Sequence, residues 1–170
     1  MKYYLPVFLL NAFLAQPAAA QIYGDAAACA SGSTAPSVLV YYDGLKDRKG
    51  KIRLELFPDN DADFLADDFV LTKAGKTFRR IELATPQSGV VAVCLRAPRA
   101  GRYTMAMIHD RDNLRKFSFS VDGAGFPGNP KLGFSKPKAA KAMVNIGNSV
   151  TVLRVRMRYF NGFGFSPVTK

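Results

Sequence analysis

Hydrophobic and polar residues alternate along several short segments of this chain, and the clearest case is KIRLELF at residues 51–57. Its apolar residues occupy every second position, with Arg53 and Glu55 between them. A period of two is typical of a β-strand that buries one face. The same pattern recurs near the C-terminus, where the polar face consists of Arg154, Arg156 and Arg158.

Turn residues divide the chain into about seven to eight such segments, which predicts an all-β antiparallel sandwich with one long loop. No helical period is found, so no helix is predicted. Tyr103 follows the turn residue Gly101 and predicts a tyrosine corner, in which the phenol bonds back to the preceding turn. The predicted strands are 37–42, 51–57, 76–83, 89–96, 102–108, 142–146 and 149–160. The first two are expected to pair as a hairpin.

The regions outside the strands define the expected boundaries. Residues 1–20 contain Lys2, an apolar run and a final Ala-Ala-Ala, which predicts a signal peptide removed after Ala20. Residues 21–36 are rich in small residues and are expected to form a flexible, irregular arm. The sandwich domain is expected over residues 37–160, with a C-terminal tail at 161–170. The protein is therefore predicted to be periplasmic or secreted, with no transmembrane segment after signal removal.

Export changes the interpretation of Cys29 and Cys94. Thiols persist as disulfides in oxidising compartments, and two cysteines permit one intramolecular pair, so a bridge between them is predicted. Two alternatives remain open. Both thiols are buried and free, or Cys29 is a lipid-bearing N-terminus, although Asp25 and a polar spacer separate it from the apolar run.

The chain is strongly basic, with a formal net charge of +11, or +10 without Lys2. A basic surface attracts anionic partners. Export argues against nucleic acid, which leaves an anionic envelope glycan, a lipid headgroup or an acidic protein. The alternative is that the charge serves solubility alone. The arginine face near the C-terminus is the best-defined basic surface, with Glu55 or Glu82 as expected cross-strand partners.

Five of the thirteen acidic residues lie within residues 59–68. Four of them have the spacing of the first, third, fifth and ninth ligands of a calcium loop. However, Phe64 occupies the position of the turn glycine, and Val70 that of the final glutamate. A solvated acidic loop is the better interpretation.

Three motifs together resemble a bacterial family of exported proteins, the domain of unknown function 2141. They are Gly101-Arg102-Tyr103, His109-Asp110 and Leu132-Gly133-Phe134-Ser135. The resemblance extends from about Cys29 to Phe160. It implies a small sandwich of immunoglobulin-like or transthyretin-like character, without an established activity.

The family pattern H-D-x-N-x-N-G-K-x-D is rich in oxygen ligands and implies a cation loop. In this chain only Asp110 and Asp112 of that set remain, because Leu114, Arg115 and Ser118 replace the other key residues. No metal and no cofactor are therefore expected. A calcium-binding module built on Asp110 and Asp112 is kept as an alternative function.

The single histidine, His109, admits a catalytic and a structural interpretation. In a hydrolase, Asp110 would orient the ring and Ser118 or Ser135 would attack. The chain has no nucleophile elbow, and neighbouring strand residues point to opposite faces. We therefore expect His109 to fix a loop through backbone groups, and Asp110 and Asp112 to bond turn amides.

Residues 121–140 form a loop longer than most compact domains contain. We expect Phe126, Leu132 and Phe134 to anchor it as an ordered flap with a basic rim of Lys131, Lys136, Lys138 and Lys141. The leading hypothesis is a monomeric, noncatalytic module of the cell envelope that binds an anionic component. The candidate binding residues are His109, Asp110, Asp112, Lys131, Lys136, Arg154, Arg156 and Arg158.

Overall fold

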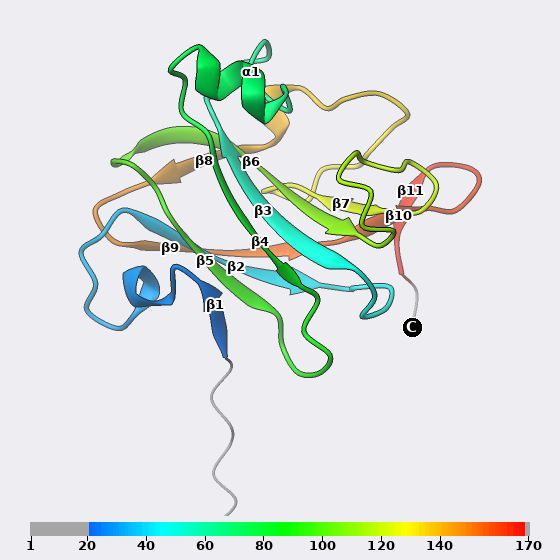
Figure 1. Cartoon of the computed structure of the whole chain (residues 1–170), viewed down its shortest axis with the longest axis horizontal. Helices are drawn as coiled ribbons and strands as arrows, with labels where there is room; N and C mark the ends of the chain where they lie inside the picture. Colours follow the sequence, from blue (N-terminus) through cyan, green and yellow to red (C-terminus); the bar gives the residue numbers. More distant parts are fainter. Residues whose placement is uncertain (1–20, 169–170) are drawn as a thin grey trace, which may run out of the picture.

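The computed structural model describes residues 21–168, so the predicted signal peptide lies outside the described residues. Two β-sheets pack face to face (Figure 1). The four-stranded sheet has the order β1 (Ile22–Gly24), β5 (Ala92–Arg96), β2 (Ser37–Asp43), β9 (Val150–Arg156). The seven-stranded sheet has the order β11 (Phe165–Pro167), β10 (Arg158–Phe160), β7 (Gly123–Gly125), β6 (Gly101–Asp110), β3 (Lys51–Phe57), β4 (Arg79–Ala84). Its seventh strand, β8 (Met143–Ile146), lies outside this order and pairs with the start of β6. The predicted all-β sandwich is confirmed.

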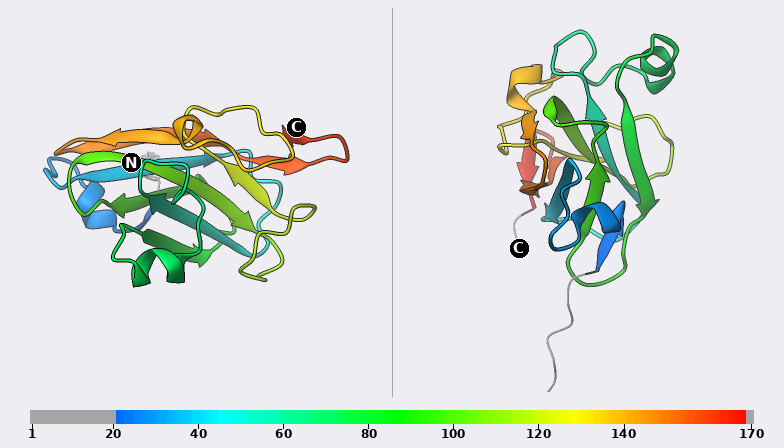
Figure 2. Two further views of the ribbon diagram at one scale, coloured as in Figure 1. Left: turned by 90° about the horizontal axis from the view of Figure 1, so that it is seen from above. Right: turned by 90° about the vertical axis from the view of Figure 1, so that its left-hand side faces the viewer.

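The alternating pattern determines which side chains fill the space between the sheets. Ile52, Leu54 and Leu56 of β3 are fully buried there, together with Val38 and Val40 of β2. Burial of this apolar surface is the main favourable contribution to folding. Figure 2 shows the sandwich from two further directions, with the loop between β6 and β7 projecting at one end of the sheets.

The C-terminal alternating run passes from one sheet to the other. Its first part, β9, lies in the four-stranded sheet, and its last part, β10, lies in the seven-stranded sheet. Met157, between the two, is fully buried and its N–H donates to the carbonyl of Asp43 at 2.8 Å. One stretch of sequence therefore links both layers.

The predicted hairpin of residues 37–42 and 51–57 is wrong. The corresponding strands β2 and β3 lie in different sheets, joined by a connection that crosses the sandwich edge. β2 pairs in parallel with β9 and antiparallel with β5, whereas β3 pairs antiparallel with β4 and β6. Alternation indicates which face of a strand is buried, but it does not identify the neighbouring strand.

The segment expected to be an irregular arm, residues 21–36, contains structure. β1 pairs in parallel with β5, and a 3₁₀ helix, η1 (Ala26–Cys29), follows it. Cys29 and Cys94 form the predicted disulfide, with Cα atoms 6.0 Å apart. The C-terminal tail likewise contributes β11, which pairs with β10.

The expectation of no helix is also wrong. A six-residue helix, α1 (Asp68–Lys73), follows the acidic loop, and a 3₁₀ turn, η2 (Ala139–Lys141), precedes β8. Asp67 caps α1 by accepting the N–H of Phe69 at 2.9 Å, which satisfies an amide at the start of the helix. Such a short helix shows no detectable period. Within residues 21–168, no helix has the length and apolar character needed to cross a bilayer.

Tyr103 forms the predicted tyrosine corner. Its hydroxyl donates to the carbonyl of Arg99, four residues upstream, at 2.9 Å. The bond holds the turn between β5 and β6 against the start of β6.

Candidate functional site

A groove of about 860 Å³ lies on the outer face of the seven-stranded sheet. Its floor contains Phe57 of β3, Ile108 of β6, Ala124 of β7 and Phe126. These side chains point away from the sandwich core, because they alternate with residues that are buried between the sheets. The volume lies within the range that small-molecule sites occupy.

Phenylalanines form the walls of this aromatic groove. Phe119 packs against Phe165 with ring centroids 4.8 Å apart, and Phe134 stacks on Phe119 at 6.1 Å. Phe117 stacks on Phe165 at 6.2 Å. Phe134 remains 69% exposed and Phe117 41% exposed. Large apolar side chains grouped on the surface in this way indicate a binding surface.

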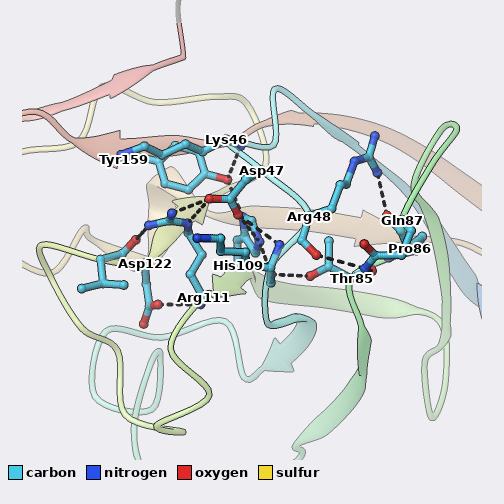
Figure 3. Close-up of polar contacts among 12 residues, drawn as sticks. Lys46, Asp47, Arg48, Thr85, Pro86, Gln87, His109, Arg111, Asp122 and Tyr159 are labelled. Atoms are coloured by element: carbon cyan, nitrogen blue, oxygen red, sulfur yellow. Dashed lines mark hydrogen bonds and ion pairs between the residues drawn. The ribbon is translucent and has the colours of Figure 1, made fainter.

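The loop of residues 111–122 forms one wall of the groove and contributes Leu114, Phe117 and Phe119. Asp122 closes the base of this loop by accepting the N–H of Arg111 and of Ser118, each at 2.8 Å. The Arg111 guanidinium donates to the carbonyl of Val121 and to the carboxylate of Asp47 (Figure 3). This pairing with Arg111 holds the pKa of Asp47 below its usual value.

A network of charged side chains lies at one end of the groove. Arg80 donates to Glu55 at 2.7 Å and to Asp68 at 2.6 Å, and Arg115 donates to Asp68 at 3.0 Å. Arg53 is almost fully buried and donates to the carbonyl of Arg115 at 2.7 Å. These charge-assisted hydrogen bonds hold the side chains at this end of the groove in place.

The groove is basic overall. Five basic and three acidic side chains line it, so its formal charge is +2. Lys116 and Lys136 are exposed at the rim, and Lys136 also lies 5.8 Å from the centre of the Phe64 ring. An apolar surface beside exposed ammonium groups is suited to a ligand with an apolar body and an anionic group.

His109 lies outside this groove, in the core between the sheets, and is 0% exposed. Its Nε2 is 2.8 Å from the carbonyl of Lys49 and therefore donates, so its Nδ1 accepts from the hydroxyl of Tyr159 at 2.7 Å (Figure 3). The Tyr159 hydroxyl also accepts the N–H of Lys46 at 3.0 Å. Burial lowers the pKa of His109. As expected, the ring holds a loop through a backbone group.

The structure separates His109 from the two serines of the catalytic interpretation. Ser135 lines the groove on the outer face of the sheet, whereas His109 points inward. Ser118 lies in the loop of residues 111–122, where its N–H is bonded to Asp122. These three residues do not converge.

Asp110 and Asp112 come together with a third acid, Asp122, which the sequence pattern did not single out. Carboxylate oxygens of the three lie within 4.8 Å of one another. Asp112 accepts the N–H of Leu114 at 3.1 Å, as expected for a turn. Asp110 lies beside the backbone amide of Asn113 in the same turn, but its Oδ1 is buried and has no hydrogen-bond partner within the described residues. Burial raises the pKa of Asp110, and the nearby Asp122 raises it further.

The acids of residues 59–68 are dispersed, each with a partner of its own. Asp59 pairs with Arg102, and Asp63 pairs with Lys76. Asp61 accepts the N–H of Ala139 at 2.6 Å and so anchors η2. The segment was expected to be a solvated acidic loop, but these acids are paired within the protein, and Asp63 is buried.

The predicted basic residues divide between separate places. Lys136 lines the groove, whereas Lys131 and the arginines of β9 and β10 do not. Arg154 lies 3.7 Å from Asp43 and over the ring of Tyr41. The expectation that Glu55 or Glu82 pairs with these arginines is wrong, because Glu55 pairs with Arg80 and Glu82 pairs with Lys51. β9 borders β2 in the other sheet, out of their reach. Of the other two arginines, Arg156 is exposed, and Arg158 donates to the carbonyl of Asn129.

The aromatic walls were missed because they come from loops, where no period indicates burial. One signal was present: seven of the thirteen phenylalanines lie between residues 117 and 165. Phe134 was expected to anchor the long loop, yet it stands in the groove with most of its surface exposed. Phe126 and Leu132 do anchor the long loop, as expected, because both pack in an apolar cluster. Asn129 adds a further attachment, since its side chain bonds the backbone of Arg154 and Arg156.

Comparison with known proteins agrees with the motifs in the sequence. No curated protein and no solved structure matches the chain. The model of a family described as uncharacterized protein conserved in bacteria (DUF2141) matches residues 40–154, which include most strands of both sheets. The chain therefore belongs to this family of uncharacterised bacterial proteins.

Proposed function

We propose that this protein is an exported, noncatalytic binding module that holds an anionic, single-chain amphiphile of the bacterial envelope in the aromatic groove. The observation that carries this proposal is the group of exposed phenylalanines beneath a basic rim. The acyl chain would lie on Phe117, Phe119 and Phe134. The anionic head group would face Lys116 and Lys136.

Export is supported by three findings. The first twenty residues have the composition of a signal peptide, the family is bacterial, and Cys29 and Cys94 form a disulfide, which persists in an oxidising compartment. In fractionated cells, we expect the protein in the periplasm or the medium. Recovery in the cytoplasm with both cysteines reduced would contradict export.

The ligand class is tested by calorimetry with dodecyl phosphate below its micellar concentration, and with dodecyl maltoside as an uncharged amphiphile of the same chain length. Dodecyl phosphate is expected to bind at least about 10-fold more tightly, which corresponds to about 1.4 kcal/mol. Equal affinity for the two, or binding of an acidic peptide in preference to both, would contradict the proposal.

The location is tested by matched pairs of exposed residues inside and outside the groove. Phe134→Ser and Lys136→Glu are expected to weaken dodecyl phosphate binding about 10-fold or more. Their controls are Phe163→Ser and Lys141→Glu, which make the same chemical changes at exposed residues that do not line the groove. Equal losses within a pair would place the binding elsewhere.

A further inference from the structure

The base of the loop of residues 111–122 brings three carboxylates together. β6 ends at Asp110, Asp112 lies in the turn that follows, and Asp122 precedes β7, so the loop closes with acids at both ends. Their oxygens lie within 4.8 Å of one another.

A second observation, on Asp110, points to a ligand at this cluster. Asp110 is only 2% exposed, and its Oδ1 has no hydrogen-bond partner within residues 21–168. The same residue borders a polar hollow of about 330 Å³, whose other lining residues are Lys51, Arg80, Glu82, Asn113 and Arg115. A buried carboxylate oxygen without a partner is costly unless a cation or water binds it.

The cluster itself carries more negative than positive charge. The nearest basic group is Arg53, whose Nη2 lies 3.6 Å from Asp110 Oδ2. Arg111 directs its guanidinium to Asp47 and the carbonyl of Val121. The three carboxylates and the one guanidinium in contact with them have a summed charge of −2, whereas Lys51, Arg80 and Arg115 line the adjoining hollow. Each oxygen of Asp122 accepts one N–H and retains a lone pair for a metal.

We propose that Asp110, Asp112 and Asp122 bind a calcium-like divalent cation at the base of this loop. Hard cations prefer oxygen ligands, and calcium accepts six to eight of them in flexible geometry. The three carboxylates supply part of that shell, and water supplies the rest from the adjoining hollow. Binding here fixes the loop that carries Leu114, Phe117 and Phe119, although the cation site does not depend on what the groove binds.

The test is a calorimetric titration of chelator-treated protein with calcium chloride up to about 10 mM, because extracellular calcium modules bind at about 10⁻⁴–10⁻³ M. We expect one site per chain. Asp112→Asn, at a partly exposed position, is expected to weaken binding at least about 10-fold. Asp110→Asn is expected to do the same. Asp59→Asn removes the same charge from the separate acidic loop and is expected to leave binding unchanged.

A second readout is amide hydrogen exchange, in which calcium should slow exchange across residues 111–122 in the wild type and not in Asp112→Asn. If Asp110→Asn fails to fold, Asp112→Asn alone decides the result. Absence of saturable binding up to about 10 mM, wild-type affinity in Asp112→Asn, or an equal loss in Asp59→Asn would overturn the proposal.

Discussion

At the scale of single residues, the buried pair of His109 and Tyr159 stabilises the fold by satisfying polar groups in an apolar core. The tyrosine hydroxyl donates to Nδ1 of the histidine and accepts the N–H of Lys46. Tyr159→Phe leaves both partners unsatisfied, so it should lower the free energy of unfolding by about 1–3 kcal/mol. Urea denaturation followed by circular dichroism measures this change. Tyr41→Phe is the control, since its hydroxyl makes no hydrogen bond within residues 21–168, and an equal effect there would contradict the explanation.

The same histidine predicts how stability depends on pH. Burial lowers its pKa in the folded state, so the unfolded chain binds a proton that the native chain does not. The contribution of His109 to the free energy of unfolding should therefore be fully present above about pH 6.5, the pKa of an unperturbed histidine. It should fall with a slope of up to about 1.4 kcal/mol per pH unit as the pH drops below that value. The slope between pH 6.5 and 5 should be smaller in His109→Gln, and an unchanged slope would assign the effect to other groups.

The structural role of His109 could be predicted from its place in a strand, because alternation separates it from Asp110. The acidic cluster could be predicted only in part. Asp110 and Asp112 are neighbours in sequence, but Asp122 joins them through the path of the loop, which no local pattern encodes.

At the scale of elements, β7 is made of small residues because the opposite sheet and β10 approach it closely. A Cβ atom on Gly123 would lie 2.3 Å from the Tyr159 ring. Gly123→Ala must therefore displace that ring and should cost about 1–3 kcal/mol of stability. Gly133→Ala is the control, because its Cβ would meet no atom within 4 Å. Similar denaturation midpoints for the two variants would show that β7 has room to adapt.

The first strand and η1 are attached to the sandwich through the disulfide as well as through β-pairing. The bridge joins residues 65 positions apart, and closing a loop of that length in the unfolded chain corresponds to about 4 kcal/mol of stabilisation. The double variant Cys29→Ser, Cys94→Ser should lose stability of that order in urea denaturation. It should also be insensitive to reductant, which destabilises the wild type. A loss of stability on adding reductant that is equal in both proteins would show that the bridge is not responsible.

Most strands could be predicted, because each buries one face and the alternation records it. Their pairing could not, as β2 and β3 show: adjacent in sequence, they lie in separate sheets, and β2 instead takes β9 as a parallel neighbour. The parallel pairs depend on contacts between distant segments. The groove could not be predicted for a related reason, since its walls combine three loop segments, the start of α1 and β11 over the outer face of β3, β6 and β7.

At the scale of the whole molecule, the positive charge is spread over surfaces that belong to different sheets. The lysines of the groove rim lie on loops over the seven-stranded sheet, whereas Arg154 and Arg156 stand on β9, in the four-stranded sheet. A net charge of +11 attracts any anion weakly. A specific site instead requires the charge to lie beside the apolar surface that holds the ligand.

Two double variants with the same change in net charge separate these effects. Lys116→Glu with Lys136→Glu alters the groove rim, and Arg154→Glu with Arg156→Glu alters β9. At an ionic strength of 0.15 M, exposed charges act over only about 8 Å. The first variant should therefore lose dodecyl phosphate binding by about 10-fold or more, while the second keeps wild-type affinity in the same calorimetric titration. Equal losses would mean that the overall field attracts the ligand, and a loss confined to the β9 variant would move the binding surface to the arginine face.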